Sequence, residues 1–231
     1  MRTVIDPFKI KSKPKYHPGR VFQKLGSMLN EHTSKKGFES FALPERSLPK
    51  NGERDSKISD QGSQDTAVTD TQRAVLLEAL LITEPLDFPV CEIGAYRGHT
   101  SRFLASRTRR SYLAVDPYIG YGAWKEDMEI MLDGTKGLNN FKHFRMTSGE
   151  ASKVITGLGF CFVDAVHDYA NTKFDGFTYG QKLVSGGVIA FHDTDNPQFP
   201  GTRRAVYEVA NSEIGFDLLF HVEDLVVLRK R

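Results

Sequence analysis

Cysteine and long apolar runs are both scarce in this chain. Among 231 residues there are only two cysteines, Cys91 and Cys161, and both lie inside apolar stretches. The chain therefore does not look like a small disulfide-held secreted protein, and we expect both thiols to be buried. No run approaches the roughly 20 consecutive apolar residues that a membrane span needs. The first residues, MRTVIDPFKIKSKPK, lack the apolar segment of a secretory signal, so we expect a cytoplasmic protein without a membrane partner.

Clustered positive charge is also lacking. The net charge is +2, although the first 60 residues hold 13 Lys and Arg against 7 Asp and Glu. These basic side chains are scattered along the segment, which favours a solvated arm over a surface that binds a polyanion. Nucleic acid is therefore not an expected partner.

The character of the sequence changes near residue 70. Residues 51–70 read NGERDSKISDQGSQDTAVTD, a polar stretch that cannot bury enough apolar surface to offset the entropy lost on ordering. We therefore predict a flexible basic and polar segment over residues 1–70 and one folded domain over residues 71–231.

In that domain, short apolar runs alternate with helical patterns. Strands are predicted at residues 88–94, 111–117, 141–147, 160–166 and 187–193, the last after a Gly186-Gly187 turn. Helices are predicted at residues 71–82, 100–106, 123–132, 150–156, 172–183 and 202–211. This alternation predicts an α/β fold with a doubly wound, mostly parallel sheet and helices on both faces. The final stretch FDLLFHVEDLVVLRK predicts an antiparallel hairpin at the sheet edge, which makes the sheet seven-stranded.

The stretch VCEIGAYRGHTSRFLA passes from the first strand directly into a helix. Gly94 and Gly98 let the backbone turn sharply and approach a ligand, and the helix that follows offers free N–H groups. Glu92, just before the first glycine, would repel a diphosphate but suits an amino group. Asp116, at the end of the second strand, is placed to bind ribose hydroxyls. These residues predict a cofactor that carries a nucleoside and an amino acid.

Four stretches, EIGAYRGHTSRFLA, LAVDPY, FVDAVHDYANTKFDG and LVSGGVIAFHDTD, resemble the class I S-adenosylmethionine-dependent methyltransferases in order and spacing. They are most similar to the branch of macrocin-type and other small-molecule O-methyltransferases. The resemblance implies a Rossmann-like fold, S-adenosylmethionine as cofactor, a sugar or other small molecule as acceptor, and a homodimer. It implies that Glu92, Gly94 and Gly98 line the methionine and sugar parts of the cofactor. Asp116 would then bind the ribose, and Ser148 would lie near the adenine.

Acidic and histidine side chains end the fourth and fifth predicted strands. Asp164 is followed by His167, and the stretch VIAFHDTD carries His192, Asp193 and Asp195. Both strands flank the first one in this fold, so we expect these groups to meet beside the cofactor. Methyl transfer to a hydroxyl is helped by a base that takes its proton. We predict Asp164 and His167 as catalytic residues, with His167 rather than His192 as the base.

A divalent cation would lower the pKa of the acceptor hydroxyl. Asp164, Asp193 and Asp195 are the predicted ligands, because Mg²⁺ prefers carboxylate oxygens. Cation-dependent O-methyltransferases carry an Asp-Asn pair at the second of these strand ends, whereas this chain has Asp193-Thr194. The sequence therefore leaves the participation of Mg²⁺ open.

Other classes of protein fit parts of the pattern. A dinucleotide-dependent oxidoreductase would need a G-x-G-x-x-G loop, and only Gly94 and Gly98 are present. A nucleic-acid N-methyltransferase would carry an Asn/Asp-Pro-Pro-Tyr motif where this chain reads VDAVHDY. A non-catalytic binding or scaffold protein with the methyltransferase fold stays open as the alternative, because Thr194 and the basic segment are compatible with it.

Overall fold

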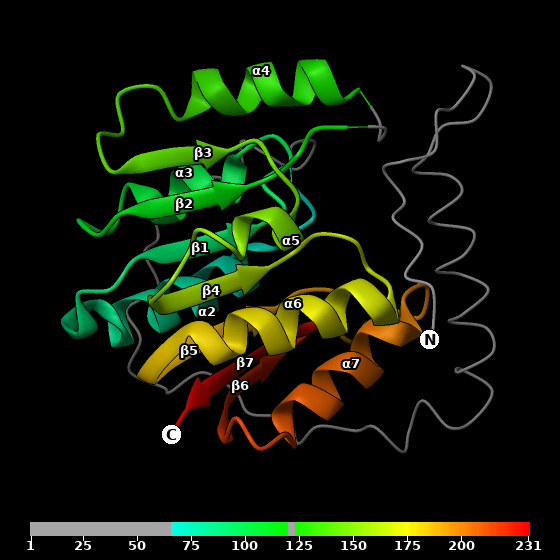
Figure 1. Ribbon diagram of the computed structural model, residues 1–231. Coiled ribbons are helices and arrows are strands. Elements are labelled where there is room, and N and C mark those ends of the chain that lie inside the picture. Colours follow the sequence, from blue (N-terminus) through cyan, green and yellow to red (C-terminus); the bar gives the residue numbers. More distant parts are fainter. Residues whose placement is uncertain (1–65, 120–122) are drawn as a thin grey trace.

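A seven-stranded sheet runs through the residues that the computed structural model describes, 66–119 and 123–231. Its strands are β1 (Val90–Ile93), β2 (Tyr112–Val115), β3 (Phe141–Phe144), β4 (Leu158–Val163), β5 (Leu183–Phe191), β6 (Phe216–Val222) and β7 (Leu225–Lys230). They lie in the order β3-β2-β1-β4-β5-β7-β6 (Figure 1). The first five strands are parallel, and β7 and β6 are added antiparallel. The predicted doubly wound fold with a C-terminal hairpin is confirmed.

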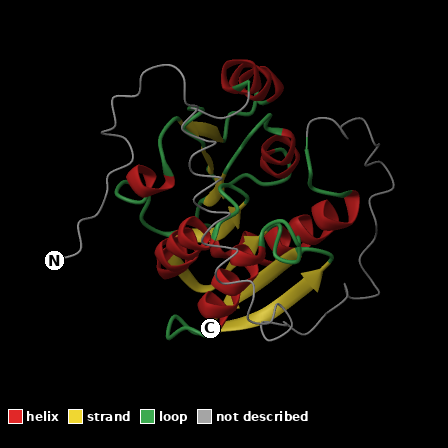
Figure 2. Cartoon of the chain, turned by 90° about the vertical axis from the view of Figure 1, so that its right-hand side faces the viewer, coloured by secondary structure: helices red, strands yellow, loops and turns green. Residues whose placement is uncertain are grey.

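Helices cover both faces of this sheet. They are α2 (Asp70–Ile82), α3 (His99–Ala105), α4 (Trp124–Gly134), α5 (Ser148–Ala151), α6 (Tyr169–Lys182) and α7 (Pro200–Ala210), with a short 3-10 helix at Glu84–Leu86. Figure 1 shows α6 and α7 on one face and α2 and α3 on the other, and Figure 2 shows the same layers after a quarter turn. Since successive side chains of a strand point to opposite faces, Val90 joins the core under α2 and α3, and Cys91 joins the core under α6 and α7.

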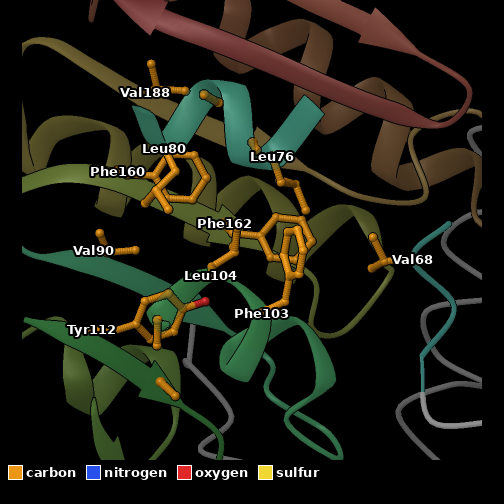
Figure 3. Packing of buried hydrophobic residues seen from close by; sticks show 14 of the residues in the cluster. Val68, Leu76, Leu80, Val90, Phe103, Leu104, Tyr112, Phe160, Phe162 and Val188 are labelled. Atoms are coloured by element: carbon orange, nitrogen blue, oxygen red, sulfur yellow. The ribbon is translucent and has the colours of Figure 1, made fainter. Parts of the chain in front are cut away.

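The core under α2 is built from large side chains. Leu76 and Leu80 of α2 point toward Phe160 and Phe162 of β4 (Figure 3), and all four are fully buried. Burying a side chain of this size stabilises the fold by roughly 1.5–3 kcal/mol. This packing fixes the start of α2 beside the ends of the central strands.

The start of α2 carries a capping box. The Thr69 hydroxyl accepts a hydrogen bond from the Gln72 amide at 3.2 Å, and Oε1 of Gln72 accepts one from the Thr69 amide at 2.8 Å. These two bonds satisfy donors that a helix start otherwise leaves free. The side chain of Gln72 also contacts Asp224 and His192.

Gly186 and Gly187 lie inside β5 rather than before it. Leu183 pairs with Leu158, but Val188 pairs with Phe160, so β5 bulges at the two glycines. Gly186 has a φ of +80°, and a Cβ on Gly187 would lie 2.9 Å from the carbonyl oxygen of Val184. The predicted turn is wrong, because the chain keeps its strand pairing on both sides of the irregularity.

Three further predictions concern the two cysteines, membrane-spanning helices and the N-terminal segment. Cys91 and Cys161 are neighbours across β1 and β4 and are buried free thiols, as predicted. Among the described helices, none combines the length and the apolar character that crossing a membrane requires. The segment 1–70 lies almost entirely outside the described residues, so the predicted boundary at residue 70 stays a prediction.

Candidate active site

The strand order reverses between β1 and β4, where β1 leads outward to β2 and β4 leads outward to β5. Ligands of open α/β sheets bind beyond the carboxyl ends of the strands at such a point. Gly94 follows β1 here with a φ of +92°, and a Cβ on it would lie 2.1 Å from the carbonyl oxygen of Asp164. The loops after β1 and β4 therefore touch, and only glycine fits between them.

Two groups of residues flank this point. The β1–β2 edge comprises Glu92, Gly94, Gly98 and Asp116, and the β4–β5 edge comprises Asp164, His167, His192 and Asp193. The first group contains most of the residues predicted to bind the cofactor, and the second contains those predicted to act on the acceptor.

In the β1–β2 edge, Asp116 holds the glycine loop. Its Oδ2 accepts hydrogen bonds from the amides of Ala95 at 3.0 Å and Tyr96 at 3.1 Å, and its Oδ1 accepts one from Tyr118 at 2.9 Å. Burial raises the pKa of Asp116, and the three amides offset that rise only in part. Tyr96 and Tyr118 both have a φ of +47°, a conformation that non-glycine residues adopt at a cost and that clusters at functional sites.

Gly98 caps the start of α3 with a φ of +71°. A Cβ on it would lie 2.6 Å from Cγ of Met131 in α4. Both glycines are thus required by close packing within the protein itself. The predicted sharp turns are present, and the prediction that both glycines line the cofactor stays a prediction.

Glu92 points into the protein, and the residue is only 1% exposed. It accepts hydrogen bonds from the Ser101 hydroxyl of α3 and, at 3.0 Å, from the Tyr112 hydroxyl of β2. Burial raises the pKa of Glu92 to about 8, even though both hydrogen bonds act to lower it. The hydrogen bonds of Glu92 therefore connect α3 to the sheet. Its predicted contact with a cofactor stays a prediction.

Ser148 is the first residue of α5, one residue after the Thr147 cap. Its carbonyl oxygen accepts a hydrogen bond from the Tyr179 hydroxyl at 2.8 Å. The backbone of Ser148 is thereby held against α6, beyond the end of β3. Its predicted proximity to the adenine stays a prediction.

In the β4–β5 edge, four side chains converge. Asp164, His167, His192 and Asp193 each offer one metal-ligating atom, and these atoms all lie within 4.8 Å of one another. Nε2 of His167 lies 3.2 Å from Oδ1 of Asp164 and 3.0 Å from Oδ2 of Asp193. Nδ1 of His192 lies 3.2 Å and 3.3 Å from the same two oxygens. The structure thus brings together the predicted catalytic pair and one further predicted ligand.

The two histidines differ in surroundings. The His192 side chain is 2% exposed, whereas that of His167 is 26% exposed and its ring lies 4.7 Å from the ring of Phe199. Burial acts to lower both pKa values, but the carboxylates of Asp164 and Asp193 outweigh it. The pKa of His167 is therefore raised, and that of His192 is raised to about 10. The histidines in turn hold the pKa of Asp164 well below its usual range.

His192 was not among the predicted ligands, although its neighbour Asp193 was. Its Nε2 lies 3.1 Å from Oε1 of Gln72, the capping residue of α2. Asp193 has a φ of +55°, and its Oδ2 lies 3.3 Å from Nδ1 of the preceding His192. The pair His192-Asp193 at the end of a strand is the signal in the sequence that could have identified His192 as a ligand. Its contact with Gln72 joins residues 120 positions apart, so the sequence alone does not reveal it.

The structure does not bring Asp195, the third predicted ligand, into this cluster. Its Oδ1 contacts Nη1 of Arg203, and its Oδ2 lies 2.7 Å from Nε2 of His221. Both carboxylate oxygens of Asp195 therefore have cationic partners outside the cluster. Two residues after the strand end, the chain has already turned away toward α7 and β6.

Comparisons with known proteins agree with this geometry. Residues 91–194 match the family described as "Methyltransferase domain", a span that contains both edges. None of the curated proteins is similar enough in sequence to match the chain.

Several solved structures share the fold. A TDP-rhamnose 3′-O-methyltransferase of calicheamicin biosynthesis is 18% identical with a TM-score of 0.54, over 70% of this chain and 81% of that one. The precorrin-6y C5,15-methyltransferase from Geobacter metallireducens is 13% identical with a TM-score of 0.54, over 73% and 93%. The O-methyltransferase from Bacillus cereus, in complex with S-adenosylhomocysteine, is 13% identical with a TM-score of 0.52, over 96% and 94%.

At these identities the neighbours establish the fold alone, and the family match covers residues 91–194, which is 104 of the 231 residues. The resemblance first seen in the sequence is confirmed at this level: the chain has the fold of these methyltransferases, and residues 91–194 are similar to the methyltransferase-domain family.

Proposed function

We propose that this protein transfers a methyl group from S-adenosylmethionine to a hydroxyl oxygen of a sugar or another small molecule. The observation that carries the proposal is the position of His167. Its imidazole is partly exposed, lies at the ends of β4 and β5, and is held by two carboxylates within 3.2 Å. A base at this place is what methyl transfer to a weakly nucleophilic hydroxyl needs.

The residues of the β4–β5 edge have different roles in this reaction. Asp164 and Asp193 orient the acceptor hydroxyl, and His167 takes its proton as the C–O bond forms. The same two carboxylates stabilise the imidazolium that results, in the way that an acidic partner supports a catalytic histidine elsewhere. A divalent cation between these carboxylates would make the hydroxyl more acidic.

The β1–β2 edge would hold the cofactor, which supplies a methyl group activated by the sulfonium charge. Asp116 is partly exposed at the end of β2, and its carboxylate can accept further hydrogen bonds from ribose hydroxyls. The neighbour from Bacillus cereus, solved with S-adenosylhomocysteine, and the sugar O-methyltransferase of calicheamicin biosynthesis support this assignment by similarity of fold.

The first experiment is a calorimetric titration of the protein with S-adenosylhomocysteine. We expect saturable binding that Asp116→Ala loses and that His167→Ala keeps. Absence of binding to the folded wild-type protein would contradict the proposed function and favour a scaffold role.

The second experiment measures methyl transfer from S-adenosylmethionine to TDP-rhamnose by mass spectrometry. Loss of a general base lowers turnover by about 10²–10⁴-fold, so we expect His167→Ala to bind cofactor normally and turn over slowly. Because the base must be neutral and its pKa is raised above 6.5, kcat/KM should rise with pH above that value in the wild type. A variant without His167 that kept the same rate and pH profile would remove it from the mechanism.

A further inference from the structure

We propose that His192 is a metal ligand, and that the cation held by His192, Asp164 and Asp193 is a divalent transition metal such as Mn²⁺, Co²⁺ or Zn²⁺ rather than Mg²⁺. The inference rests on the proposed function in one respect, since both place a cation at the β4–β5 edge. It adds a nitrogen ligand and a class of metal that the carboxylates alone did not predict.

The side-chain amide of Gln72 has a defined orientation. Its Nε2 donates to the carboxylate of Asp224, and its Oε1 accepts from the backbone amide of Thr69 at 2.8 Å. Neither contact works with the amide reversed, because a carboxylate cannot donate and a backbone N–H cannot accept. The atom that faces Nε2 of His192 at 3.1 Å is therefore an acceptor.

The orientation of Gln72 determines which hydrogen the imidazole of His192 carries toward it. Facing an acceptor, its Nε2 carries the hydrogen, and the remaining nitrogen, Nδ1, faces the β4–β5 edge. Nδ1 is fully buried and makes no hydrogen bond, although it lies 3.2 Å from Oδ1 of Asp164 and 3.3 Å from Oδ2 of Asp193. When Nδ1 gives up its proton, its lone pair faces two carboxylate oxygens, and a cation among these three atoms takes the place of that proton.

Either a proton on Nδ1 or a metal ion would balance the two carboxylates beside His192. A proton on Nδ1 would point along a line that meets neither carboxylate oxygen in acceptable hydrogen-bond geometry. A metal ion needs only that the three atoms converge, and each cluster member contributes an atom within 4.8 Å of the others. The contact between Gln72 and Nε2 is also the partner that metal-binding histidines usually have on their second nitrogen.

The donor set decides the class of metal. Mg²⁺ selects oxygen ligands in a near-octahedral arrangement and keeps much of its water, whereas imidazole nitrogen suits transition metals. One imidazole and two carboxylates, with His192 only 2% exposed, favour an ion that accepts nitrogen.

The test uses metal binding alone, without cofactor or acceptor, so its failure leaves the proposed methyl transfer untouched. The full chain is stripped with a chelator and titrated with Co²⁺, whose visible absorption reports nitrogen and oxygen ligation. We expect one Co²⁺ per chain and no displacement by Mg²⁺ at about 100-fold excess, in line with the preference of imidazole for transition metals. Absence of binding by the folded protein, or displacement by equimolar Mg²⁺, would overturn the proposal.

Two variants identify the nitrogen. His192→Asn replaces it with an amide and should weaken Co²⁺ binding by more than about 100-fold, beyond the cost of losing an outer-shell partner. His143→Asn, in β3 outside the cluster, is the matched control and should bind Co²⁺ as the wild type does. Equal affinities in both variants would overturn the proposal. If His192→Asn does not fold, X-ray absorption of the cobalt-loaded His167→Ala protein decides, because imidazole scattering must persist when His167, the other histidine of the cluster, is absent.

Gln72 has its own test as a positioning residue. Gln72→Met removes the acceptor and should weaken Co²⁺ binding by about 10–100-fold. Thr69→Ala breaks the same capping box without touching His192, and it should leave the affinity unchanged. Equal losses in the two variants would mean that Gln72 acts only through the stability of α2.

Discussion

The two edges of the site are built in opposite ways. In the β1–β2 edge, the polar side chains already have partners within the protein: Glu92 receives two hydroxyl donors, and Asp116 receives three backbone amides and keeps room for a further donor. In the β4–β5 edge, two histidines and two carboxylates face one another, and one buried nitrogen has no hydrogen bond. The first edge is therefore a scaffold that shapes a loop, whereas the second holds groups whose pairing is incomplete without a ligand.

Because of this difference, we expect the β1–β2 edge to matter mainly for stability and the β4–β5 edge mainly for activity. Substitutions in the β1–β2 edge should mainly lower the free energy of unfolding, because each removes a hydrogen bond or introduces a clash. Substitutions in the β4–β5 edge should mainly lower activity, since its polar groups lack a full set of hydrogen-bond partners within the protein. Four measurements test this contrast.

The largest effect is expected where the two edges touch. Gly94→Ala would place a Cβ 2.1 Å from the carbonyl oxygen of Asp164, so the strands must separate. We expect a loss of about 4 kcal/mol or more in unfolding free energy, a size that marks severe clashes, or failure to fold. Gly137→Ala is the control, since Gly137 has a similar φ of +88° but no atom within 4 Å of a Cβ. That variant should lose only about 1–2 kcal/mol; equal losses would show that the contact with Asp164 does not matter.

The next effect is a pH dependence carried by Glu92. Its pKa is about 8 in the folded protein against 4.5 for the free side chain. Between these values the folded state keeps a proton that the unfolded state releases, so stability falls as pH rises from about 5 to about 8. Glu92→Gln mimics the protonated form, and urea unfolding should show it close to the wild type at pH 5 and more stable at pH 8. A difference between the two proteins that does not change with pH would contradict the buried, protonated Glu92.

A smaller effect is expected at Asp116. Asp116→Asn removes the charge and one of the two oxygens that serve three backbone amides. Hydrogen bonds to a charged group contribute about 1.5–3 kcal/mol, so we expect a loss of about 2 kcal/mol in urea unfolding without cofactor. A neutral result would mean that Asp116 is reserved for the ligand and does not belong to the scaffold.

The smallest effect on stability is expected at His167. His167→Ala removes a partly exposed ring, and His192 still lies beside the same two carboxylates, so we expect a loss of about 1 kcal/mol, the central value for point substitutions. The same variant should show the large loss of turnover described above. A strong destabilisation with little loss of turnover would reverse the contrast between the two edges.

Much of the fold followed from the sequence alone. Alternating apolar runs and helical patterns predicted all seven strands, because period and length are local properties of the chain. The β5 glycines show the limit of this reasoning. Gly186 and Gly187 look like a turn, and only the pairing of β4 with β5 shows that the strand continues through them.

The site divides in the same way. The sequence placed Asp164, His167 and Asp193 at neighbouring strand ends, because parallel strands bring their carboxyl ends to one edge, and the structure brings these three together. It could not exclude Asp195, since a turn of two residues carries that carboxylate to Arg203 and His221. Nor could it find that Gln72 fixes the orientation of His192. Residue types and local periodicity are written in the sequence, but which lone pair meets which hydrogen depends on packing between segments more than 100 residues apart, and only the tertiary structure decides it.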